Sequence, residues 1–156
     1  LLIVIDNKDV ADSFRAQFNV LWNQSTIVYT GIIGPKKVFG ELAKTKIELL
    51  AFGLNTKILD KILSKELKEL NEHLEKNNIP EKLLFNKKPN KKLFARLSKL
   101  KHLPKEYFSP LHVEIYENNV AIIDWNEPIT TIIINKKEIV NQYRSYFNLL
   151  WKIAKP

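Results

Sequence analysis

The chain has 156 residues, 45% of them hydrophobic, and its 25 Lys and Arg against 17 Asp and Glu give a formal net charge of +8. This size is typical of one globular domain with its own core. The absence of Cys excludes disulfide scaffolds, thiolate metal sites and cysteine nucleophiles, and no apolar run reaches the ~18 residues that span a membrane. We therefore expect a cytoplasmic protein, and the first residue, Leu rather than Met, indicates a fragment of a longer chain.

The first segment of the chain is repeated at its end. Residues 5–22 align without a gap on residues 134–151, an offset of 129 (151 minus 22), and seven of the 18 aligned pairs are identical. Random matching at average residue usage would give roughly one identity. Each copy begins with a short β-branched run, typical of a strand, and continues with apolar residues at helical spacing. The helices end in Trp22 and Trp151, which we expect to be core residues.

The repeat divides the chain into residues 1–24 and residues 25–156. The shorter segment reads as the tail of a preceding repeat or as a linker helix that joins two subunits. Asp6 or Asn7 is expected to cap its helix, and Asn135 is expected to cap the helix of the second copy. The longer segment then forms a complete unit.

This unit opens with alternating strand and helix patterns. Apolar runs of strand length alternate with amphipathic stretches, the arrangement that produces parallel strands joined by helices. The expected elements are a strand at 27–29, a helix at 35–44, a strand at 47–52, a long helix from Asn55 or Thr56 to Asn77, a strand at 82–85 and a basic helix at 89–100.

The pattern then changes to antiparallel hairpins. Residues 111–117 alternate between apolar and polar side chains, and Asn118-Asn119 is a suitable two-residue turn. Residues 120–125 and 129–134 supply two further strands before the closing helix. We predict an α/β fold with a mixed sheet and helices on both faces.

Candidate ligand-binding residues lie on the hairpin and at strand ends. With a turn at 118–119, His112 and Glu114 share a face with Trp125, and His112 lies directly opposite Trp125. A His with a carboxylate two residues away could do acid–base work or bind a polar ligand, and a satisfied structural His is the competing interpretation. Because α/β sheets hold ligands at the carboxyl ends of their strands, the predicted site comprises Phe52, Gly53, Asn86, His112, Glu114 and Trp125.

The positive charge is concentrated in residues 81–105. This segment has nine Lys and Arg and one acid, Glu81, so nine minus one accounts for the whole net charge of the chain. A solvated Lys-rich face and a nucleic-acid-binding patch are both compatible with this pattern. The candidate nucleic-acid residues are Lys87, Lys88, Lys91, Lys92 and Arg96.

Motifs for metals, nucleotide cofactors and activated serines are missing from the sequence. There is no His-x-x-His, no Gly-rich phosphate loop and no Ser in a nucleophile-elbow context. We therefore expect no metal, no cofactor and no catalytic residue.

The element order and the closing helix, Tyr146 to Trp151, resemble half of a phospholipase D-type domain. Those enzymes carry His-x-Lys-x4-Asp on the equivalent hairpin, whereas here His112 is followed by Glu114 and Asn119. A Glu in place of the Lys would repel a phosphodiester, so the resemblance implies an inactive unit. A residual phosphodiesterase with His112 as nucleophile is the enzymatic alternative.

The chain is more closely similar to the effector domain of archaeal TrmB-type transcription regulators, whose C-terminal part is a degenerate phospholipase D-like domain. The segments that carry this similarity include residues 28–31, 47–53, 83–86, 103–107 and 115–123. The resemblance implies a non-enzymatic ligand-sensing and dimerisation domain, acting as a homodimer. It further implies a sugar or metabolite as effector, and DNA contacted mainly through a helix-turn-helix domain that this fragment lacks.

Overall fold

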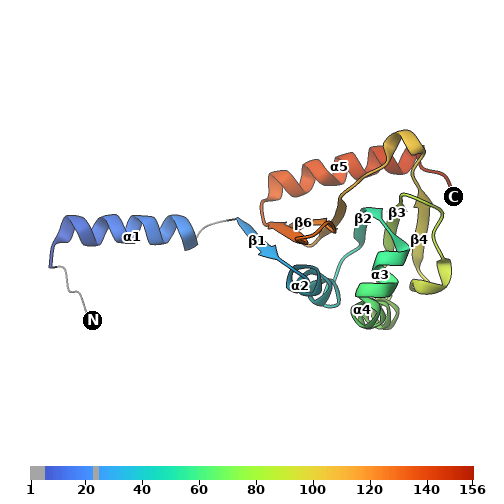
Figure 1. Ribbon diagram of the computed structural model, residues 1–156, viewed down its shortest axis with the longest axis horizontal. Coiled ribbons are helices and arrows are strands. Elements are labelled where there is room, and N and C mark those ends of the chain that lie inside the picture. The colour runs from blue at the N-terminus through green and yellow to red at the C-terminus, as the bar shows by residue number, and fades with distance from the viewer. Residues whose placement is uncertain (1–5, 23–24) are drawn as a thin grey trace.

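The chain forms one isolated helix and an α/β body, seen in a computed structural model that describes residues 6–22 and 25–156 (Figure 1). The isolated helix is α1 (Lys8–Trp22), which lies apart from the body in both ribbon views. Asn7 caps it as predicted, because its Oδ1 accepts the backbone N–H groups of Asp9 and Val10 at 2.9 and 3.1 Å. The strand predicted at residues 2–5 and the Trp22 side chain lie outside the described residues.

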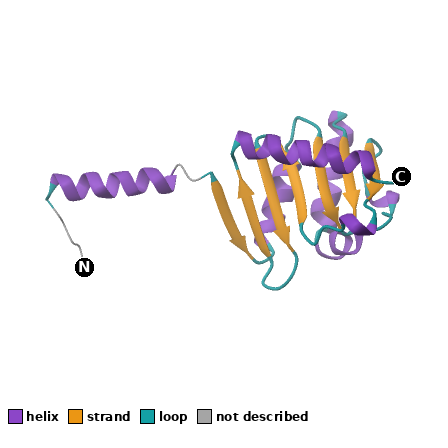
Figure 2. Cartoon of the chain, turned by 90° about the horizontal axis from the view of Figure 1, so that it is seen from above, coloured by secondary structure: helices purple, strands orange, loops and turns teal. Residues whose placement is uncertain are grey.

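The described residues place a seven-stranded mixed sheet at the centre of the body, in the order β1-β7-β6-β5-β2-β3-β4 (Figure 2). β2, β3 and β4 are parallel neighbours, and the other neighbouring pairs are antiparallel. The strands are β1 (Thr26–Thr30), β2 (Leu49–Leu54), β3 (Glu81–Phe85), β4 (Ser98–His102), β5 (His112–Tyr116), β6 (Asn119–Asp124) and β7 (Thr130–Ile134).

Helices cover both faces of this sheet, as predicted. Figure 1 shows α5 (Lys137–Ile153) on one face, and α2 (Ile33–Leu42), α3 (Thr56–Ile62) and α4 (Ser64–Asn77) on the other. The long helix predicted from Asn55 is interrupted at Leu63, whose backbone leaves the helical region at φ −122° and ψ 27°. Its apolar stripe is buried nevertheless, because Leu63 packs into the core with Leu59, Leu67, Leu70 and Leu74.

Alternation along the central strand β2 builds the two halves of the core. Leu49 and Ala51 face α2 and α4, whereas Leu50 and Phe52 face α5. A strand that is covered on both faces has no polar side, which explains its continuous apolar run. The site described below lies on the α2–α4 face.

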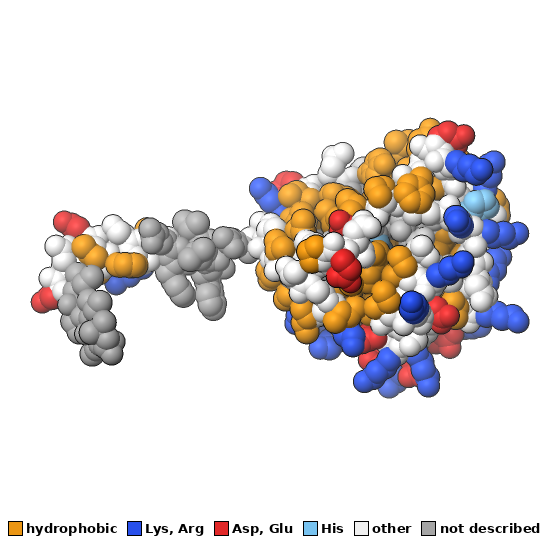
Figure 3. Space-filling view, in the orientation of Figure 1, with side chains coloured by type: hydrophobic (Ala, Val, Ile, Leu, Met, Phe, Trp, Pro, Cys, Tyr) orange, Lys and Arg blue, Asp and Glu red, His pale blue; other side chains and the backbone are white. Residues whose placement is uncertain are grey.

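The prediction of a basic helix at residues 89–100 is wrong. The segment contains only a short 3₁₀ turn, η1 (Lys91–Leu93), and then β4, which pairs in parallel with β3. Phe94 packs edge-on against Phe85 with ring centroids 5.2 Å apart, which draws the loop onto the core. The open edge of β3 supplies backbone hydrogen bonds that outweigh the helical preference of lysines. Lys and Arg side chains consequently gather on the side of the body where β4 lies (Figure 3).

The predicted hairpin register is also wrong, by two residues. Tyr116 pairs with Asn119, and Glu117 in the turn takes a left-handed backbone conformation at φ 46°. His112 therefore lies opposite Ile123 rather than Trp125. A shift of two residues keeps every side chain on its predicted face, since strand side chains alternate with period two.

Asn135 does not cap α5 as predicted. Residue Lys136 precedes that helix without a capping side chain. The Asn135 amide instead donates to the Asn118 backbone oxygen at 3.3 Å and to Asn119 Oδ1 at 2.8 Å. It thus fastens the β5–β6 turn to the end of β7.

Candidate ligand-binding site

A cavity of about 630 Å³ opens at the carboxyl ends of β2 and β3. Its walls are the end of β2, the first turns of α3, the loop after β3, the segment that follows the 3₁₀ turn η2 (Lys105–Tyr107), and the residues after β6. A cavity of this size is typical of sites for small molecules. Among its lining residues are Gly53, Lys57, Asn86, Phe108, Trp125 and Asn126.

Gly53 and Asn86 shape the wall of this cavity. Gly53 has φ 75°, and a Cβ atom built on it would lie 2.0 Å from the Leu111 backbone oxygen. Only glycine permits this close approach of the segment before β5. The Asn86 side chain donates to the Ser109 oxygen at 2.7 Å and accepts the Ser109 N–H at 3.0 Å. Asn86 therefore holds the wall in place, and its amide is occupied by protein.

Trp125 supplies an aromatic surface to the cavity. It follows β6, packs with part of its ring against the core and remains half-buried. Phe108, which is 61% exposed, lines the same cavity. Such rings pack against the apolar face of a sugar or a planar group while polar neighbours bind its edges.

His112 and Glu114 lie behind Trp125 and do not line the cavity. Both side chains are buried and His112 Nε2 lies 2.7 Å from Glu114 Oε1, whereas His112 Nδ1 has no hydrogen-bond partner among the described residues. The His112 ring is 6.0 Å from the Trp125 ring and meets Phe39 edge-on at 6.2 Å. Glu114 has alanines beside it on both neighbouring strands, which leaves room for its carboxylate.

Phe52 lies on the opposite face of the sheet from the cavity. It packs against Tyr146 of α5 at a centroid distance of 5.6 Å. Of the six residues predicted to form one site, the structure brings Gly53, Asn86 and Trp125 to the cavity wall. His112 and Glu114 stand one layer deeper, and Phe52 is separated from them by the sheet.

Several cavity residues were absent from the predicted site. Lys87 and Lys88, predicted as nucleic-acid ligands, line this cavity instead of standing apart from it. Lys57 is placed by Asn55, whose Oδ1 accepts the Lys57 N–H at 3.1 Å. The sequence Asp124-Trp125-Asn126 is typical of a turn stabilised by an Asp side chain, and this pattern could have predicted Asn126 beside Trp125. In the structure Asp124 Oδ1 accepts the Asn126 N–H at 3.0 Å.

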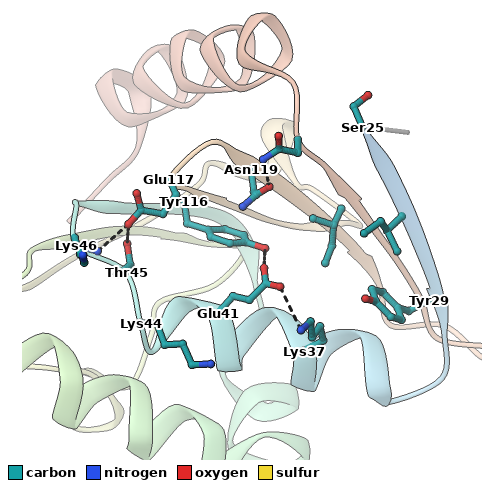
Figure 4. A pocket seen from close by; sticks show the side chains of 13 residues that line it. Ser25, Tyr29, Lys37, Glu41, Lys44, Thr45, Lys46, Tyr116, Glu117 and Asn119 are labelled. Atoms are coloured by element: carbon teal, nitrogen blue, oxygen red, sulfur yellow. Dashed lines mark hydrogen bonds and ion pairs between the residues drawn. The ribbon is translucent and has the colours of Figure 1, made fainter. Parts of the chain in front are cut away.

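A larger cavity, about 790 Å³, lies near the β5–β6 turn (Figure 4). Its carboxylates are already bound by protein groups: Tyr116 donates to Glu41 at 2.7 Å, and Thr45 donates to Glu117 at 3.0 Å. Burial, and then the bond to Glu41, raises the pKa of Tyr116 above its usual range. A ligand would have to displace these bonds, so the cavity beside Trp125 is the better candidate.

Among residues 6–22 and 25–156, no three His, Asp or Glu side chains gather as the ligands of a metal ion would. No helix in the same ranges is long and apolar enough to cross a membrane.

Two solved bacterial structures share this architecture. NucT from Helicobacter pylori matches with a TM-score of 0.65 at 9% identity, over 83% of this chain and 97% of that chain. Nuc from Salmonella typhimurium, a phospholipase D family member, matches with a TM-score of 0.59 at 13% identity over the same shares. The fold is phospholipase D-like.

TrmBL2, an archaeal chromatin protein with a novel mode of DNA binding, shares the phospholipase D-like fold of this chain. The TM-score is 0.59 at 16% identity over 95% of this chain, which spans 64% of the length of the TrmBL2 chain. The predicted similarity to TrmB-type effector domains is thus confirmed at the level of fold. No protein-family model matches the chain, and no curated protein sequence does.

Proposed function

We propose that residues 25–156 form a non-enzymatic ligand-sensing domain of a transcription regulator, with the cavity beside Trp125 as the effector site. The observation that carries this proposal is the separation of Trp125, which lines the cavity, from His112 and Glu114, which are buried and bonded to each other. The His112–Glu114 pair therefore has no contact with a molecule in the cavity. Binding without turnover is the function that this geometry supports best.

The expected effector is a small polar molecule such as a sugar or another metabolite, bound without a cofactor. Trp125 and Phe108 offer apolar ring faces, and Asn126 and Asp60 offer hydrogen-bonding groups at the same cavity. The likeness to TrmBL2 supports a DNA-associated, cytoplasmic role. DNA would then be bound mainly by a helix-turn-helix domain other than residues 1–156.

A thermal-shift screen of sugars and metabolites tests the effector site. An effector should raise the melting temperature of the wild-type chain and of Tyr107→Ala, a matched aromatic variant whose side chain lies outside the cavity lining. Trp125→Ala should abolish that rise. An equal rise in Trp125→Ala would contradict the site, and turnover of a generic phosphodiester would contradict the non-enzymatic assignment.

We also propose that the domain works as a homodimer. An apolar stripe at helical spacing on α5 is exposed, with Leu149 at 59% and Ile153 beside it, and Tyr146 is exposed in part although its ring also contacts Phe52. A second copy of this chain would remove that stripe from water. Sedimentation should show a dimer for the wild type and a monomer for Leu149→Glu. A wild-type monomer at high concentration would contradict this proposal.

Residues 1–24 are proposed to be an extension of the domain, the tail of a preceding repeat. Phe14 of α1 is 63% exposed, whereas its repeat partner Tyr143 packs half-buried against the sheet. Phe14 thus lacks the sheet face that the repeat implies. A chain of residues 25–156 alone should unfold at the same denaturant concentration as the whole chain. A large drop would show that α1 supports the body.

A further inference from the structure

The edge strand β4 and the part of the loop directly before it, residues 91–102, carry five of the nine Lys and Arg residues of the segment 81–105. We define the basic edge as Lys91, Lys92, Arg96, Lys99 and Lys101. The one acid in the surrounding segment, Glu81, is buried, accepts a hydrogen bond from the Ser98 hydroxyl, and has its pKa raised by burial to about 7. The solvent-facing side of this edge therefore carries cations without a carboxylate of the same segment beside them.

The cations of the basic edge are not neutralised by ion pairs. Among the described residues, Lys82 is the only cation of residues 81–105 with an ion pair, to Glu48 at 3.2 Å. On α4 the opposite holds, because Lys65 pairs with Glu69 and Lys68 with Glu72, both at 3.9 Å. A surface of paired charges is electrically balanced, whereas the basic edge projects a positive potential.

The basic edge also contains a groove. A groove of about 460 Å³ runs along β4, lined by Lys91, Arg96, Lys99 and Lys101 with Trp151 beside them. Lys99 and Lys101 are two residues apart on one strand, so they project from the same face about 6.6 Å apart. Lys101 Nζ lies 4.6 Å from the centre of the Trp151 ring and donates to the Trp151 oxygen at 3.0 Å. This cation is held in place before any partner arrives.

The aromatic residues beside the groove, Phe94 and Trp151, are half-buried and already packed against protein groups. Trp151 stacks on Phe147 at 5.7 Å and has Lys101 over its ring, and Phe94 packs on Phe85. Single-stranded nucleic acid needs free rings for base stacking, which this edge does not offer. A row of cations without free rings or base-reading amides suits the phosphates of a duplex.

We infer that the basic edge binds the phosphate backbone of duplex DNA without reading its sequence. This contact goes beyond the proposed effector function, because the sensing domain itself would add to the DNA affinity of a helix-turn-helix domain. Lys87 and Lys88 stand at the rim of the effector cavity rather than in the groove. They are not needed for this contact.

Fluorescence anisotropy with a short labelled duplex tests the inference on the chain as it exists. Two triple variants are compared. The basic-edge variant has Lys91, Lys92 and Lys99 changed to Gln. The control has Lys61, Lys65 and Lys68 of α3 and α4 changed to Gln. Each triple variant lowers the net charge from +8 to +5 (8 minus 3). All six side chains are exposed, so folding should be unaffected, as circular dichroism can verify.

We expect wild-type affinity to fall between roughly 50 and 200 mM salt, with a slope near −0.9 for each neutralised phosphate. The basic-edge triple variant should lose at least about 10-fold in affinity and reduce that slope by roughly 3, while the control changes little. Equal losses in the two variants would overturn the inference, because net charge alone would then explain binding. So would no binding at low salt, or tighter binding to anionic lipid vesicles than to the duplex.

Discussion

The His112–Glu114 pair on β5 and the cavity beside Trp125 lie on the same side of the sheet, yet only the cavity is open. In the pair, two polar side chains are buried and bonded to each other at 2.7 Å. In the cavity, Trp125 keeps part of its ring uncovered beside Asn126 and Phe108. The difference shows that residue types associated with catalysis can serve as core when their partners are inside the protein. The residues that can contact a ligand are then their neighbours, such as Trp125.

The largest expected effect on stability is at the buried His112–Glu114 pair. His112→Ala leaves the Glu114 carboxylate buried without a partner, which should lower the free energy of unfolding by about 4 kcal/mol. Urea denaturation measures the change. Replacing both residues with Leu is the control and should recover much of the loss, because an apolar pair needs no partner. A loss below about 1 kcal/mol for His112→Ala would show that the pair is not structural.

Glu81 gives the next largest effect, one that depends on pH. Burial raises its pKa from 4.5 to about 7, so the folded chain keeps a proton that the unfolded chain releases. The stability that this proton contributes is complete below pH 4.5 and is lost as pH rises through about 7, in total roughly 3 kcal/mol. Glu81→Gln should flatten this dependence and unfold later than wild type at pH 8. Parallel pH profiles of the two chains would contradict the burial argument.

At the cavity, Trp125→Ala should affect effector binding more strongly than stability. Because the ring is only half-buried, its loss should lower the free energy of unfolding by about 2 kcal/mol, less than His112→Ala. The thermal response to an effector should nevertheless disappear. If stability fell as far as in His112→Ala, the contrast between an open and a closed region would fail.

The smallest effect is expected at Phe108. Its ring is 61% exposed, so Phe108→Ala should change the free energy of unfolding by less than about 0.5 kcal/mol. It should still weaken effector binding, measured by the concentration of effector that gives half of the maximal thermal shift. Unchanged binding would restrict the aromatic surface of the site to Trp125.

Much of the fold follows from patterns that the sequence displays locally. The alternation at His112, Glu114 and Tyr116 predicted β5 and its faces, although the turn was placed one residue late. The segment that became β4 could not be predicted in the same way. Lys99 and Lys101 suit a helix or a strand equally, and the choice was made by the free edge of β3.

The candidate site was predictable only in its outline. Gly53 and Asn86 stood out because each directly follows a buried apolar run. Phe108 and Ser109 reach the cavity through a bond to Asn86, 23 residues earlier than Ser109 in the chain, and no local pattern records such a contact. The burial of His112 depends equally on distant partners, among them Phe39 of α2.

The position of β1 at the end of the sheet determines when this strand can pair during folding. Thr26 pairs with Ile134, 108 residues later (134 minus 26), whereas β2 and β3 join across a single crossover. Closing so long a loop costs entropy before any contact compensates for it, and pairings of this kind slow folding. During synthesis β1 emerges first and finds its partner strand only when β7 has been made. Until then the backbone groups of β1 have no partner strand, and Ile27 and Val28 stay exposed even after β1 has paired, so this edge strand is open to other chains during and after folding.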